Sequence, residues 1–154
     1  MDCDEYYLPT EFEWAKKYFI RIGCFGSVIQ LYTYFKSAEL RQEMVDNYYI
    51  PFIHQIFDNT IAGSPNYPFH ADPTRKINCL NVIQIPIHCQ HYSWVRRDIK
   101  RKARNSTARR NIEKSSLMSD WETAKEGSIV NGGNKLIKVP DYFGINKMIA
   151  TLEY

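Results

Sequence analysis

The chain has 154 residues, of which 44% are hydrophobic and 24% are charged. This length and composition fit one ordinary globular domain and exclude a wholly disordered chain. The formal net charge is only +3, and residues 1–13 contain acidic side chains but no lysine or arginine. A secretory or transit signal begins with basic residues, so we expect no cleavable targeting signal.

The N-terminal region predicts a long helix. Thr10 and Glu13 match a capping box, which places the start of the helix near Glu11. We expect the acidic pairs Asp2/Asp4 and Glu11/Glu13 to stabilise the positive end of its dipole. From Phe12 to Phe35 the apolar residues cover the whole circumference at about 100° per residue, which is typical of a helix buried on all sides.

This apolar helix has two possible surroundings. Residues 22–35 carry no charge, and that length is typical of a core helix in a soluble α-helical domain. If Arg21 snorkels toward head groups, residues 18–35 become long enough for one short membrane span. Small residues would let a second helix approach closely, and we predict a helix-packing face at Gly23, Gly26 and Ser27.

The expected organisation has three regions. Residues 1–57 form the N-terminal helical region, which Pro51 limits. Residues 58–90 form an extended connector, because 58–75 contain three prolines and no helical period. Residues 91–154 hold a basic helix, a hairpin at 128–139 around Gly132 and Gly133, and a C-terminal arm. The predicted fold is therefore mainly α, with a small C-terminal β-hairpin and no compact catalytic fold.

The stretch 96–110 holds eight basic residues and one acidic residue. At helical spacing five of the bases share an arc of about 140°, and apolar residues collect on the other side. Such a face can contact anionic lipid head groups, an acidic protein surface or RNA, while the alternative is a solvated face. The predicted contact residues are Arg96, Arg97, Lys100, Arg101 and Arg104.

Reactive side chains are present but show no catalytic pattern. Cys79 and Cys89 lie near His88 and His91, yet zinc sites usually contain tight C-x2-C or H-x3-H pairs, so we predict no metal. No nucleophile is spaced to meet His54. We predict no catalytic residues, no cofactor and no small-molecule substrate.

These observations favour an interaction protein over a small enzyme. We expect a non-catalytic accessory subunit of a large membrane-associated multiprotein assembly, namely a respiratory-chain complex of the mitochondrial inner membrane. Its partners would be other subunits, with anionic lipid or an acidic protein surface at the basic helix. The alternative is an RNA-contacting accessory protein of an organellar ribosome.

Overall fold

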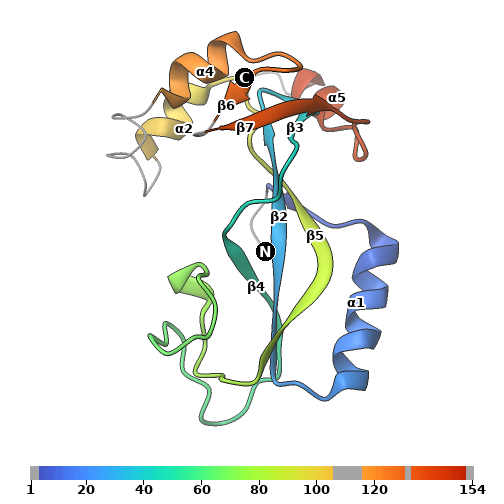
Figure 1. Cartoon of the computed structure of the whole chain (residues 1–154), viewed down its shortest axis with the longest axis vertical. Helices are drawn as coiled ribbons and strands as arrows, with labels where there is room; N and C mark the ends of the chain where they lie inside the picture. Colours follow the sequence, from blue (N-terminus) through green and yellow to red (C-terminus); the bar gives the residue numbers. More distant parts are fainter. Residues whose placement is uncertain (1–3, 106–115, 131–132, 152–154) are drawn as a thin grey trace. The chain divides into compact units, whose positions relative to one another are not determined.

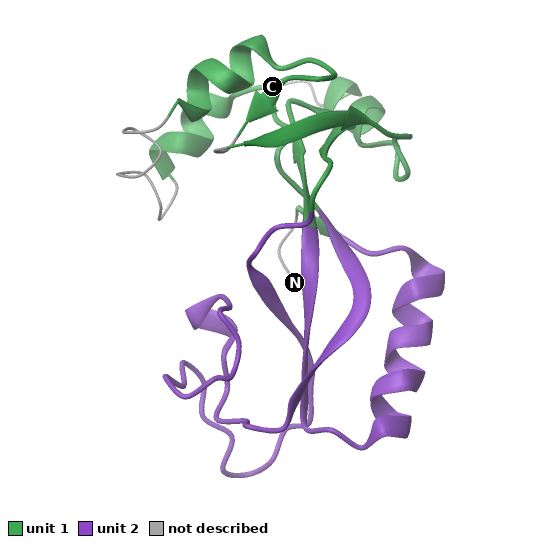
Figure 2. Ribbon diagram, viewed as in Figure 1, with its two compact units in different colours: residues 1–5, 32–44, 91–154 green, residues 6–31, 45–90 purple. Residues whose placement is uncertain are grey.

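The computed structural model describes residues 4–105, 116–130 and 133–151. These residues contain four α-helices and a seven-stranded mixed sheet, with 28% of the described residues helical and 32% in strands. The prediction of a mainly α fold is therefore wrong. Figure 2 shows two compact units: unit 1 comprises Met1–Glu5, Tyr32–Met44 and His91–Tyr154, and unit 2 comprises Tyr6–Leu31 and Val45–Gln90.

The strands form a continuous series of hydrogen-bonded neighbours in the order β1-β5-β2-β3-β7-β6, and β4 pairs with β2. Two long strands, β2 and β5, contribute residues to both units. The strands are β1 (Glu5–Tyr6), β2 (Gly26–Phe35), β3 (Ser37–Gln42), β4 (Tyr49–His54), β5 (Val82–Trp94), β6 (Ile129–Val130) and β7 (Asn134–Lys138). The α-helices are α1 (Pro9–Ile22), α2 (Ile99–Asn105), α4 (Leu117–Thr123) and α5 (Ile145–Thr151), and η1 (Pro73–Arg75) is a short 3-10 helix.

The predicted long helix is replaced by a helix followed by a strand. Helix α1 ends at Ile22, because Gly23 adopts the left-handed conformation with φ 69° and donates its backbone N–H to the carbonyl of Phe19. Strand β2 is rich in β-branched and aromatic residues, which favour strands. A run of apolar residues without a polar face fits a buried helix and also a strand that is buried on both faces. The apolar pattern therefore led to a wrong prediction of helix at 26–35.

None of the helices in the described residues is both long and apolar enough to cross a membrane. The helical part of residues 18–35 stops at Ile22, and β2 occupies the C-terminal part of this range. The predicted helical span at these residues is therefore corrected.

Helix α1 begins earlier than the capping-box pattern predicts. Pro9 occupies the first turn, and the N-cap is Leu8, whose side chain makes no capping hydrogen bond. Proline is favoured in a first turn because its fixed φ suits a helix and its missing N–H would have no helical partner there. The start of α1 therefore depends on proline and not on the Thr10/Glu13 pair.

The core of unit 2 follows from the way side chains alternate between the two faces of its strands. Ile29 and Leu31 of β2, with Ile85 and Ile87 of β5, are buried with residues of α1 in one cluster. These positions differ by two, so they point to one face of the sheet. Val28, on the other face, packs with Tyr67 and Ala71 of the segment between β4 and β5. Figure 1 shows α1 on one side of β2 and β5, and this segment on the other side. The helix thus covers one face and the irregular segment covers the other.

The core of unit 1 lies around Phe35, which is completely buried at the end of β2. Strands β6 and β7 pair as an antiparallel hairpin, with Ile129 opposite Lys135, and supply Val130 and Leu136 to this core. The segment 131–132 of the expected hairpin turn lies outside the described residues. Helix α4 closes the cluster with Leu117.

Candidate functional site

Helix α2 holds the centre of the predicted basic stretch. The carboxylate of Asp98 accepts a hydrogen bond from the backbone N–H of Arg101 at 2.8 Å, which caps the first turn. Ile99 is buried, and Ala103 packs against the Phe35 cluster of unit 1. One side of α2 is therefore held by the core of unit 1. Residues 106–110 of the predicted stretch lie outside the described residues.

Two of the five predicted contact residues make contacts inside unit 1. The Nη2 of Arg96 lies 2.9 Å from Oδ2 of Asp4, and its Nε donates to the carbonyl of Ser93 at 3.1 Å. The Nη2 of Arg97 donates to the carbonyl of Ala150 at 2.8 Å, where a cation also suits the negative end of α5. Arg96 and Arg97 therefore have a structural role in unit 1.

The other three predicted residues, Lys100, Arg101 and Arg104, are exposed. Within the part of the chain that the structure describes, their side chains make no hydrogen bond or ion pair. At helical spacing they fall within an arc of about 100°. We call these three residues the basic face of α2. Its positive charge is available to a partner.

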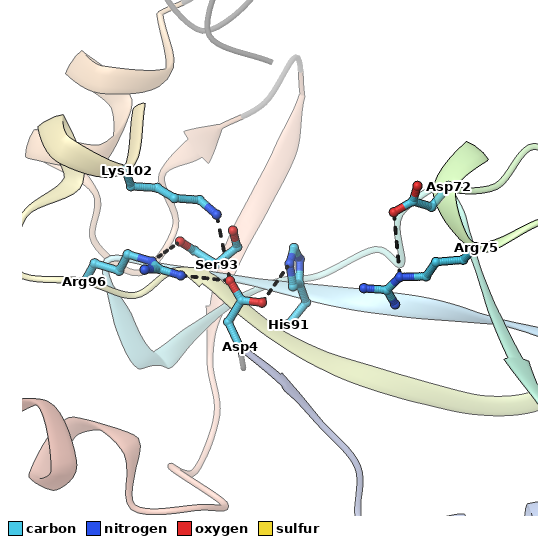
Figure 3. A network of polar contacts seen from close by, with 7 residues as sticks. All are labelled: Asp4, Asp72, Arg75, His91, Ser93, Arg96 and Lys102. Atoms are coloured by element: carbon cyan, nitrogen blue, oxygen red, sulfur yellow. Dashed lines mark hydrogen bonds and ion pairs between the residues drawn. The ribbon is translucent and has the colours of Figure 1, made fainter. Parts of the chain in front are cut away.

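Asp4 is the centre of an ion-pair network that the sequence did not reveal. Figure 3 shows its carboxylate facing Arg96, Lys102 and His91, and the Lys102 Nζ and His91 Nε2 each lie 3.9 Å from it. The Asp4 side chain is only 14% exposed, and its carbonyl accepts a hydrogen bond from the backbone N–H of Tyr92 at 2.8 Å. The expected role of Asp4 in the dipole of a helix is therefore wrong. It ties the N-terminal segment to residues that lie far along the chain.

A second polar cluster lies in unit 2. Nε2 of His54 lies 2.9 Å from the hydroxyl oxygen of Tyr67. Burial lowers the pKa of His54, and burial raises the pKa of Cys79 and of Tyr67. Burial thus favours the neutral form of each group.

His54 should give the stability of the protein a pH dependence. The pKa of His54 in the folded chain lies below the usual 6.5. Above pH 6.5 the buried, neutral His54 therefore makes its full contribution to the free energy of unfolding. The contribution is lost as the pH falls through the lower folded value, because the unfolded chain binds the proton more tightly. We expect His54→Gln to remove this part of the loss. The test is to measure the free energy of unfolding by urea for both proteins at several pH values between neutral and acidic. An equal decrease of this free energy with falling pH in both proteins would contradict the prediction.

The predicted helix-packing face is wrong, because two of its residues lie in a strand. Gly23 ends α1, whereas Gly26 and Ser27 belong to β2. The register between β2 and β4 shifts at Ser27. There the Ser27 Oγ donates to the carbonyl of Ile53 and accepts from its N–H, both at 3.0 Å. The serine hydroxyl thus satisfies two backbone groups at the irregularity.

No cluster of three or more histidine, cysteine or acidic side chains in the described residues is arranged to hold a metal ion. Comparison with known proteins gave no significant match to a protein family, to a characterised protein or to a solved structure. Any functional proposal for this chain therefore depends on its own residues.

Proposed function

We propose that this chain is a non-catalytic subunit of a larger multiprotein assembly, and that the basic face of α2 binds an acidic surface of another subunit. The supporting observation is the unbalanced charge of Lys100, Arg101 and Arg104, which are exposed together on one short helix. Like charges on one face repel each other unless an anionic partner screens them. An acidic protein surface supplies the opposite potential and orients the partner.

The small size of the basic face favours an acidic protein surface over RNA as its partner. Binding to a nucleic acid depends on neutralising many phosphates, and each phosphate contact adds to affinity. Here the ion pair of Arg96 and the hydrogen bond of Arg97 occupy two of the five predicted bases, and the net charge of the chain is only +3. A small set of directed ion pairs suits a protein interface. The narrower expectation of a mitochondrial respiratory-chain complex stays a prediction.

The test is to size the native protein after gentle detergent extraction. The first variant reverses the basic face with K100E/R101E/R104E. The control is K125E/K135E/K138E, which makes the same change in net charge at three other exposed lysines of unit 1. Both sets are exposed, so we expect both proteins to fold.

We expect wild type and control to migrate in a particle far larger than 18.2 kDa. The K100E/R101E/R104E variant should lose most of this association, because each interfacial pair becomes a like-charge contact. Equal migration of the two variants would contradict the proposal. Collapse of the wild-type particle after nuclease treatment would instead support the RNA alternative.

A further inference from the structure

Three turns of unit 2 lie side by side, and hydrogen bonds join them. The backbone N–H of Phe25 donates to the carbonyl of Asn81 at 3.2 Å, and the N–H of Asn78 donates to the carbonyl of Ile61 at 3.0 Å. The rings of Phe25 and Phe57 meet edge to face, with their centroids 5.6 Å apart. The turns at 22–25, 56–61 and 78–81 therefore form one connected region.

This region exposes large apolar side chains. Each of them is between 47% and 76% exposed, although burial in the core would favour folding. Contiguous exposed apolar side chains commonly mark a surface that contacts another protein or a membrane. We call the group the apolar tip, and its members are Ile22, Phe25, Ile56, Phe57, Ile61 and Leu80.

Charged residues around the apolar tip are mostly basic. Arg21 immediately precedes Ile22, Lys17 lies one helical turn earlier, and Lys76 leads into the third turn. Asp58 is the acidic residue of the three turns. The acidic residues of α1 are in its N-terminal half, and a helix of 14 residues is about 20 Å long. The end of α1 that meets the tip is therefore positively charged.

We propose that the apolar tip inserts into the interfacial region of a membrane that contains anionic lipids. Aliphatic and phenyl groups flanked by lysine and arginine are the combination that binds this interface, since the apolar groups enter the acyl boundary and the cations contact head groups. A dimer formed through the two apolar tips is less favourable, because it would bring the same basic side chains of both copies together. The inference concerns unit 2 and is independent of the function proposed for α2.

The experiment uses the full chain and sedimentation with vesicles. One set of vesicles is phosphatidylcholine, and the other also contains about 30 mol % phosphatidylserine. The tip variant is Ile56→Asp with Leu80→Asp, two side chains that are 74% and 76% exposed. The control is Met44→Asp with Ile129→Asp, which are 64% and 60% exposed and lie in unit 1. Thermal unfolding checks that both variants fold.

Wild type and control should sediment with the phosphatidylserine vesicles, and more weakly without the anionic lipid. The tip variant should lose about tenfold or more of this binding, because charged groups resist entry into the acyl boundary. Binding of K100E/R101E/R104E should persist. The inference fails if wild type does not sediment with either vesicle, if the tip variant binds like wild type, or if the K100E/R101E/R104E variant alone loses binding. A dimer that the tip variant abolishes, without vesicle binding, would also overturn it.

Discussion

Replacing Gly26 with alanine should destabilise the protein by about 2 kcal/mol, because unit 2 has no room for a methyl group there. A Cβ at this position would lie 2.8 Å from Cδ2 of His54, 3.1 Å from Cγ2 of Val82 and 3.2 Å from Sγ of Cys79. The His54 ring cannot easily move away, because its Nε2 is hydrogen-bonded to the hydroxyl of Tyr67. The shift in the midpoint of urea unfolding measures the loss.

A double-mutant cycle identifies the cause of this loss. His54→Ala removes the nearest atom, so Gly26→Ala should cost less in that background than in the wild type. The strands can then adjust by the few tenths of an ångström that Val82 and Cys79 require. The same cost in both backgrounds would show that crowding against His54 is not the reason for glycine at this position.

The second large effect is expected at Asp4. Asp4→Asn should lower the free energy of unfolding by about 2 kcal/mol, because hydrogen bonds to charged groups stabilise a protein more than hydrogen bonds between neutral groups. The substitution keeps the size of the side chain but leaves Arg96, Lys102 and His91 around a neutral amide. Part of this basic cluster stays in contact with water, as Arg96 is 37% exposed, so the effect is smaller than for a fully buried pair.

Asp72→Asn is the matched control for Asp4→Asn. The Asp72 carboxylate lies 3.7 Å from Nε of Arg75, and its side chain is 32% exposed. It also accepts from the N–H of Thr74 at 2.9 Å as the N-cap of η1, a role that asparagine performs equally well. We expect this control to cost less than about 1 kcal/mol. Equal losses at the two positions would contradict a special role for the Asp4 network.

The basic face of α2 was partly predictable because its pattern is local. The spacing of Lys100, Arg101 and Arg104 follows from helical geometry, and a helix at Ile99–Asn105 displays them together. The partners of Arg96 and Arg97 were not predictable. Asp4 lies 92 positions from Arg96, and Ala150 lies 53 positions from Arg97, so no local pattern connects them.

The amino-acid sequence alone determined the features that depend on neighbouring residues. These include the basic face of α2 and the turn at Gly133 before β7. Gly23 was instead predicted to lie inside a longer helix, and the structure places it at the end of α1. That residues 26–35 form a strand depends on tertiary packing, because the same apolar run fits both a buried helix and a strand that is packed on both faces. The tertiary structure also decided that three distant turns form one apolar tip, since hydrogen bonds between turns depend on how the chain folds back.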